Sequence, residues 1–138
     1  MKRSRRVFLS YAQADRALAD LLARDIAAAG YAVWSDRNLL PGDNWAKEIA
    51  DALESSEAMV VIVSPSAAKS EWVKREVEYA IGSDRYAKRL IPVVVQPTPE
   101  MPWILERMPS VPATGNPRTV SKKVVAALEH AVAPAESG

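Results

Sequence analysis

A tryptophan and a glutamate are spaced so that they share one face of a predicted helix. The apolar run 58–63 predicts a strand buried on both faces, and Ser64-Pro65 ends it because proline cannot donate to a strand ladder. Ser70 suits the N-cap of a following helix, which we expect to run to about residue 87. On that helix Trp72 and Glu76 lie four residues apart, so a carboxylate stands beside an indole at the carboxyl end of a central strand. Open parallel sheets bind their ligands at that end.

Two further predicted loops bring polar and aromatic side chains to the same edge. One follows a strand at 7–11, and the other spans 35–44 after a strand at 31–34. With the loop after residue 63 they supply hydroxyls, carboxylates, a cation and aromatic rings: Ser10, Tyr11, Asp36, Arg37, Asp43, Trp45 and Ser64. Carboxylates bind vicinal hydroxyls, and an indole face takes a flat cationic ring. The mixture suits a sugar with a stacked heterocycle, and a carboxylate beside a ribosyl carbon can stabilise an oxocarbenium-like transition state.

The elements that must position these groups alternate between strand and helix. Strands are predicted at 7–11, 31–34, 58–63, 90–95 and about 110–114, and the segments between the first four show apolar residues at helical spacing. A final helix follows the fifth strand. The alternation predicts an α/β fold, a flavodoxin-like three-layer sandwich with a central parallel sheet of about five strands.

Local signals refine these elements. Asp15 is expected to cap the first helix and Gly30 to lie just beyond its end. Pro41-Gly42 marks a turn, after which Asp43 or Asn44 caps the second helix. Pro92 indicates an edge position or a bulge in the fourth strand. A short turn of helix is expected at 102–107.

Composition excludes several classes of function. The 138 residues carry a net charge of +1, which argues against nucleic acid or an anionic membrane as a partner. The chain has no cysteine and one histidine, so thiolate and His-rich metal sites are excluded and a reducing, cytoplasmic location is expected. No apolar run reaches the ~20 residues of a membrane span. Residues 1–6 are predicted as a basic tail, 7–132 as one domain and 133–138 as a flexible tail.

Known phosphate-binding and nucleophile motifs are absent. The sequence contains no G-x-G-x-x-G after the first strand, no G-x-x-x-x-G-K-[ST] and no G-x-S-x-G. The paired acids and acceptor aspartate that a receiver domain needs are replaced by Ser10-Tyr11 and Ser64-Pro65.

Three motifs in order resemble those of a bacterial TIR domain. The first is Val7-Phe8-Leu9-Ser10-Tyr11 with Asp15, and the second, which resembles the BB loop, runs from Val33-Trp34-Ser35-Asp36 to Leu40-Pro41-Gly42-Asp43. The third is the strand 59–64 followed by Ser70-x-Trp72-Val73-x-x-Glu76. The resemblance covers about residues 5–130. The family's later Phe-Trp box is not evident, and Met101-Pro102-Trp103 is a loose substitute.

The resemblance implies an enzyme that cleaves NAD⁺. Glu76 matches the catalytic glutamate of NAD-cleaving members, and Trp72 matches the tryptophan four residues before it. The other positions implied to bind substrate are Ser10, Tyr11, Asp36, Arg37, Gly42, Trp45 and Ser64. NAD⁺ would be the substrate, with no metal or other cofactor. We expect Glu76 to face solvent, so that its replacement by alanine leaves the fold intact.

Two functions remain open from the sequence. The first is NAD⁺ nucleosidase activity that gives nicotinamide and ADP-ribose or a cyclic isomer. Such activity would be promoted by self-assembly with other TIR domains, in an effector module of bacterial defence whose sensor domain lies outside this chain. The second is a non-catalytic signalling and assembly module that acts through TIR–TIR contacts.

Overall fold

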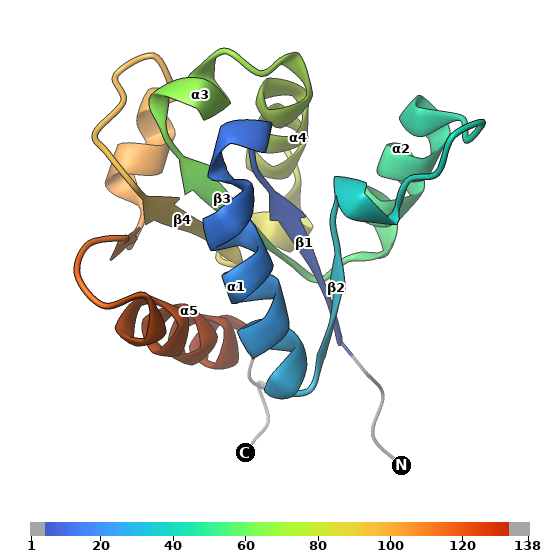
Figure 1. Cartoon of the computed structure of the whole chain (residues 1–138). Coiled ribbons are helices and arrows are strands. Elements are labelled where there is room, and N and C mark those ends of the chain that lie inside the picture. The colour runs from blue at the N-terminus through green and yellow to red at the C-terminus, as the bar shows by residue number, and fades with distance from the viewer. Residues whose placement is uncertain (1–4, 133–138) are drawn as a thin grey trace.

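A parallel sheet of five strands forms the centre of the computed structural model, which describes residues 5–132 apart from the Arg37 side chain (Figure 1). The strands lie in the order β2-β1-β3-β4-β5, and every neighbouring pair is parallel. Their bounds are Arg5–Ser10 for β1, Tyr31–Trp34 for β2, Ala58–Val63 for β3, Leu90–Val94 for β4 and Val111–Pro112 for β5. This is the flavodoxin-like order, so the predicted fold class is confirmed.

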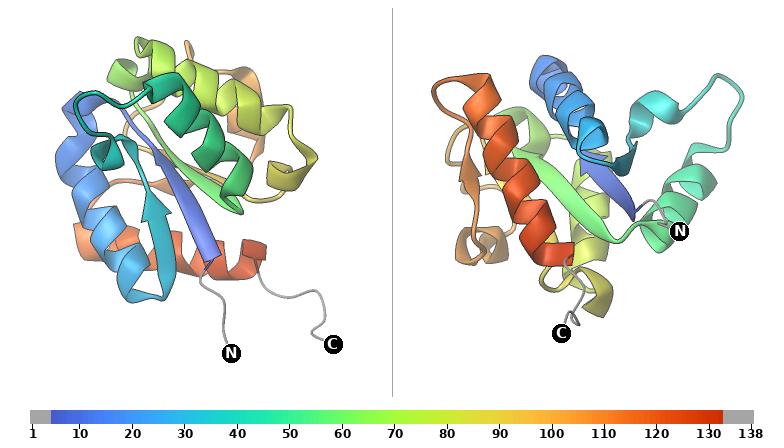
Figure 2. Two further views of the ribbon diagram at one scale, coloured as in Figure 1. Left: turned by 90° about the vertical axis from the view of Figure 1, so that its right-hand side faces the viewer. Right: turned by 90° about the horizontal axis from the view of Figure 1, so that it is seen from below.

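Helices cover both faces of the sheet (Figure 2). One face is covered by α1 (Arg16–Ala28) and α5 (Pro117–Val132), and the other by α2 (Trp45–Ser55), α3 (Pro65–Ala68) and α4 (Glu71–Ile81). Strand β3 is buried along its whole length, and its side chains alternate between the two cores. Val60 and Ile62 pack with α1 and α5, whereas Met59 and Val61 pack with α2 and α4.

Four short 3-10 helices lie between these elements. They are η1 (Gln13–Asp15), η2 (Asp36–Asn38), η3 (Asp84–Tyr86) and η4 (Trp103–Arg107). The last confirms the helical turn expected at 102–107. The first two lie directly after β1 and β2, where the sequence indicated only loops, and they carry side chains of the site described below.

The third helical region is shorter than its pattern suggested. Helix α4 ends at Ile81 and not near residue 87, because Gly82 stands at its C-cap and η3 begins two residues later. The segment before α4 was expected to be a loop but contains α3. Ser64 caps that helix by accepting a hydrogen bond from the Ala67 amide, and Pro65 occupies its first turn, where proline is favoured.

The strand boundaries correct two further expectations. Strand β1 begins at Arg5, inside the predicted basic tail, while the rest of that tail and the predicted tail at 133–138 lie outside the described residues. Strand β4 has neighbours on both sides and an uninterrupted register, so Pro92 marks no bulge and β4 is not an edge strand, but Pro92 itself has a paired neighbour only on β3. It is tolerated where β4 pairs with β3 alone, because the two residues of β5 lie opposite Val93 and Val94.

The predicted glycine turns are confirmed. Gly30 follows α1 with a φ of 104°, and Gly42 sits in the turn before α2 with a φ of 92°, a region that L side chains rarely adopt. Within residues 5–132, no helix is both long enough and apolar enough to cross a bilayer.

Candidate active site

A cavity of about 280 Å³ opens at the carboxyl ends of β1 and β2, beside α4 and the start of α2. Five residues that the sequence singled out line it: Tyr11, Asp36, Trp45, Trp72 and Glu76. The remaining lining residues are Leu9, Ala12, Gln13, Leu39, Ile49 and Ser70. The cavity therefore combines two carboxylates with aromatic and aliphatic surface at the edge where parallel sheets bind ligands.

Glu76 is buried in the wall of this cavity. Its side chain is on the face of α4 that packs against the sheet, and the residue is only 5% exposed, so the expectation of a solvent-facing glutamate was wrong. Ser10, the last residue of β1, donates a hydrogen bond of 2.7 Å to Glu76 Oε1. Burial raises the pKa of Glu76 to about 7, although the Ser10 hydroxyl opposes this rise and the charge of Asp36 adds to it. A carboxyl group near half-ionisation at neutral pH is typical of functional sites.

Asp36 reaches the cavity from η2. Its Oδ2 accepts a hydrogen bond of 3.3 Å from the Gln13 side-chain amide of η1, so the 3-10 helices after β1 and β2 are joined at the cavity. Within the described part of the chain, Asp36 Oδ1 is buried without a hydrogen-bond partner. An acceptor of this kind suits a ligand hydroxyl, because a buried polar atom left unpaired is costly.

Three aromatic side chains complete the walls. Tyr11 is buried directly after β1, and Trp72 is half-buried in the first turn of α4. The Arg75 guanidinium lies 5.5 Å from the centroid of the Trp72 ring. Trp45 starts α2 and is 46% exposed, so its ring has free surface toward solvent as well as toward the cavity.

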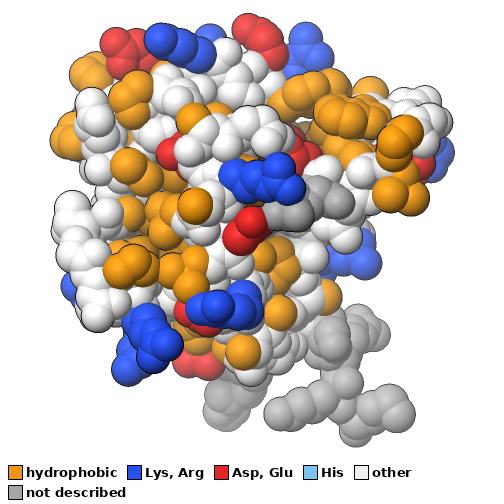
Figure 3. Space-filling model, viewed as in Figure 1, with side chains coloured by type: hydrophobic (Ala, Val, Ile, Leu, Met, Phe, Trp, Pro, Cys, Tyr) orange, Lys and Arg blue, Asp and Glu red, His pale blue; other side chains and the backbone are white. Residues whose placement is uncertain are grey.

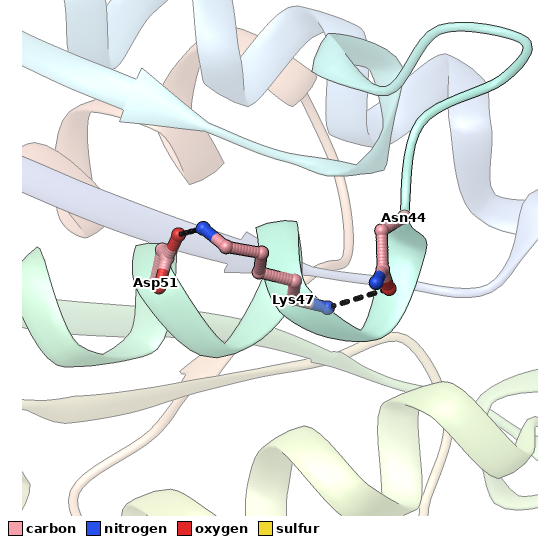
Figure 4. A network of polar contacts seen from close by, with 3 residues as sticks. All are labelled: Asn44, Lys47 and Asp51. Atoms are coloured by element: carbon pink, nitrogen blue, oxygen red, sulfur yellow. Dashed lines mark hydrogen bonds and ion pairs between the residues drawn. The ribbon is translucent and has the colours of Figure 1, made fainter.

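The position of Trp45 is fixed by the cap of α2 (Figure 4). Asn44 is the N-cap, and its Oδ1 accepts a hydrogen bond of 3.2 Å from the Lys47 amide. The Lys47 ammonium forms an ion pair of 2.8 Å with Asp51 one turn later. Asp43 was the other candidate cap, but its Oδ2 accepts a hydrogen bond of 2.7 Å from the Leu40 amide and closes the preceding turn.

Three of the predicted substrate-binding residues whose side chains the structure describes do not line the cavity: Ser10, Gly42 and Ser64. Ser10 contacts the cavity residue Glu76 but does not itself line the cavity, and Gly42 forms the turn before α2. Ser64 donates a hydrogen bond of 2.5 Å to Asp15 Oδ2, which ties the end of β3 to η1. This contact replaces the predicted side-chain cap of α1 by Asp15, since Asp15 makes no such cap bond. The backbone of Arg37 lies in η2, but its side chain is outside the described part of the structure.

Two residues that shape the site were not predicted from the sequence. Gln13 was read as part of a loop, and its contact with Asp36 depends on how η1 and η2 approach each other. Leu39 lies within the loop motif but carries no polar group that would single it out. Ser70 was identified as a helix cap and does accept from the Val73 amide, yet it also lines the cavity.

An apolar surface lies next to the cavity. Leu40, in the turn before α2, is 62% exposed, and Trp45 adds its own exposed ring. Hydrophobic side chains gather on the corresponding side of the molecule, over α2 and the turn before it (Figure 3). The opening of the cavity is therefore next to uncovered apolar surface.

The described geometry agrees with a family match over most of the chain. A family model described as "TIR domain" matches residues 7–130. The chain belongs to the TIR domain family. The sequence-based assignment to this family is thus confirmed.

Two curated proteins are similar in sequence. The "2' cyclic ADP-D-ribose synthase BtTIR" of Bacteroides thetaiotaomicron is 32% identical over 89 residues, and the "Stimulator of interferon genes protein" of Magallana gigas is 28% identical over 92 residues. These matches cover 61% and 64% of this chain, but only 30% and 22% of the two relatives. This TIR domain thus spans less than a third of the length of either protein.

Solved structures share the fold. The TIR domain of the Toll-related receptor TRR-2 from Hydra magnipapillata superposes with a TM-score of 0.63 at 26% identity, covering 75% of this chain and 80% of that chain. A metazoan TIR-STING receptor from C. gigas, in complex with 2',3'-cGAMP, gives a TM-score of 0.74 at 23% identity. It covers 88% of this chain and 38% of that chain.

Proposed function

We propose that this TIR domain is an NAD⁺ nucleosidase that cleaves the bond between nicotinamide and ribose. The observation that carries the proposal is Glu76, a buried carboxyl group on the wall of a cavity with aromatic sides. The similarity to a cyclic ADP-ribose synthase supports NAD⁺ as the substrate class. Trp72 and Trp45 offer ring faces for the nicotinamide, and Asp36 Oδ1 offers an acceptor for a ribose hydroxyl.

The chemistry follows from the charge of the substrate. Nicotinamide in NAD⁺ is a cationic ring, and it leaves as a neutral molecule with the electron pair of the broken bond. Positive charge then develops on the ribosyl carbon, where the ionised Glu76 stabilises it. Water then bonds to this carbon and releases a proton to solvent, which gives ADP-ribose. If an adenine nitrogen or a ribose hydroxyl of the same molecule bonds to the carbon instead, with the hydroxyl releasing its proton, the product is a cyclic isomer.

Self-assembly and a partner domain are part of the proposal. The chain spans only part of the longer proteins that it resembles, one of which is a TIR-STING receptor. We therefore infer that a sensor domain outside this chain gathers several TIR domains, as a cytoplasmic effector of defence would require.

A second function is favoured by one observation. Leu40 and Trp45 form exposed apolar surface at the mouth of the cavity, which suits contact with another TIR domain. A signalling module that assembles without catalysis would use this surface and would not need Glu76.

The test is nicotinamide release from NAD⁺ by the purified domain, followed by chromatography at high protein concentration and again with the domain fused to a forced oligomer. Glu76→Gln should abolish release. Glu78→Gln is the matched control, since Glu78 is exposed on the same helix and should leave release unchanged. Equal turnover by wild type and Glu76→Gln would contradict the assignment. If the wild type releases no nicotinamide even as a forced oligomer, the non-catalytic assembly module is favoured.

A further inference from the structure

We propose that Ser10 is a positioning residue, whose hydroxyl holds Glu76 Oε1 and thereby fixes the orientation of the Glu76 carboxylate in the cavity. The sequence resemblance placed Ser10 among the substrate contacts instead. The inference concerns the site of the proposed function, but the contact between the two side chains can be tested without NAD⁺.

The fold brings the two side chains face to face. Ser10 is two residues after Phe8 on β1, so both point to the same side of the sheet. Phe8 belongs to the core beneath α2 and α4, and Glu76 is on the buried face of α4 with Val73 and Val77. The serine therefore stands opposite the glutamate across the contact between strand and helix, where they meet at 2.7 Å.

Burial excludes a direct role for Ser10 in contacting a ligand. Ser10 is 1% exposed and does not line the cavity, although its neighbours Leu9 and Tyr11 do. Its hydroxyl can donate one hydrogen, and Glu76 takes it. Because Oε1 accepts the hydrogen bond from Ser10, which does not line the cavity, Oε2 is the oxygen through which Glu76 can contact a ligand.

The contact also favours the charged form of Glu76. A hydroxyl that donates to a carboxylate stabilises the ionised state and lowers its pKa, against the opposing effects of burial and of Asp36. Among the side chains that the structure describes, Tyr11 and Asp36 are the titratable groups that line the cavity with Glu76, while Arg75, its neighbour on α4, lies over the Trp72 ring. Within residues 5–132, Ser10 is thus the donor from the sheet that helps keep this buried group ionised.

The experiment is a pH titration of Glu76 by carbon NMR in protein labelled with ¹³C-glutamate, without NAD⁺. The Glu76 carboxyl signal is assigned as the one missing from Glu76→Gln. Wild type should titrate with a midpoint near 7. In Ser10→Ala the midpoint should rise by about one pH unit, which lowers the ionised fraction at pH 7 about fivefold. Ser10→Thr keeps the hydroxyl and should restore the wild-type midpoint.

Ser64→Ala is the matched control. Ser64 is also buried, follows the next strand and donates to a carboxylate, but that carboxylate belongs to Asp15. Ser64→Ala should leave the titration midpoint of Glu76 unchanged. An unchanged or lower midpoint in Ser10→Ala would overturn the proposal, as would equal movement in both alanine variants, which would indicate general loosening of the site.

Activity supplies a separate readout. If the wild type cleaves NAD⁺, the acid limb of its kcat/KM profile should move to higher pH in Ser10→Ala by the amount seen in the titration. If the Glu76 midpoint shifts in Ser10→Ala but the wild type does not cleave NAD⁺, the contact between Ser10 and Glu76 would be supported and the proposed function contradicted.

Discussion

Asp36 and Glu76 line one cavity, and the charge of Asp36 raises the pKa of Glu76. The two carboxyl groups come from η2 and α4, so their proximity is a product of the fold. Like charges that share a site oppose each other's ionisation. Burial, together with this relationship, raises the pKa of Glu76 to about 7.

Activity should therefore rise with pH through the titration of Glu76. The ionised form stabilises positive charge on the ribose, so kcat/KM should show an acid limb with a midpoint near 7. Asp36→Asn removes the neighbouring charge and should move this limb to lower pH, whatever it does to KM. A wild-type midpoint near 4.5, the ordinary value for glutamate, would contradict the burial of Glu76.

Stability should change with pH in the opposite sense. The pKa of Glu76 is about 4.5 in the unfolded chain and about 7 in the folded one, so between these values the folded state binds more protons. The free energy of unfolding should fall by about 3 kcal/mol as pH rises through this range and then level off. Glu76→Gln removes this contribution.

Urea unfolding at pH 5 and pH 8 measures the effect. The stability of Glu76→Gln relative to wild type should be higher at pH 8 than at pH 5. Glu78→Gln, on the exposed face of the same helix, should show no such difference. Parallel stability profiles for wild type and Glu76→Gln would show that Glu76 titrates normally.

Trp45 should contribute to binding with little effect on folding. It is 46% exposed at the mouth of the cavity, so Trp45→Ala should change stability by no more than about 1 kcal/mol while raising KM for NAD⁺. Trp103→Ala is the matched control, because Trp103 is 68% exposed in η4 and does not line the cavity. An equal rise in KM for both variants would contradict a role for Trp45 in binding.

The contact between Ser64 and Asp15 should stabilise the fold. Ser64→Ala loses this hydrogen bond and the cap of α3, which should cost about 1–3 kcal/mol of unfolding free energy. Asp15→Ala removes the acceptor of this hydrogen bond and should cost less, because the cap of α3 remains. A double-mutant cycle by urea unfolding should give a coupling energy of at least about 0.5 kcal/mol, and additive effects would show that the two side chains act independently.

The sequence predicted the fold well because its strongest patterns are local. The apolar run 58–63 and the strand at 31–34 were predicted with their exact bounds, since each is followed by a polar or turn signal. The failures also have physical causes. The proline at position 92 could not distinguish an edge strand from an interior strand whose neighbour, β5, is too short to pair opposite it.

The sequence indicated some of the residues that line the cavity but not their contacts. Helical spacing placed Glu76 beside Trp72, yet the same spacing suggested a solvent-facing carboxylate. The burial of Glu76 depends on β1, which is 66 residues away in the sequence and supplies Ser10. Gln13 and Asp36 likewise meet only after η1 and η2 have formed, so no periodicity indicates their hydrogen bond.

The two sides of the cavity should differ in how often their backbone hydrogen bonds open. Ser10 and Glu76 belong to an interior strand and to a helix packed on the core, so amides around them should exchange with deuterium only when much of the domain unfolds. Asp36 and Trp45 flank the exposed turn with Gly42, whose amides should exchange through small local openings. The group proposed to do the chemistry thus stands on the slowly exchanging side. The groups proposed to recognise the ligand stand on the side that can adjust to it.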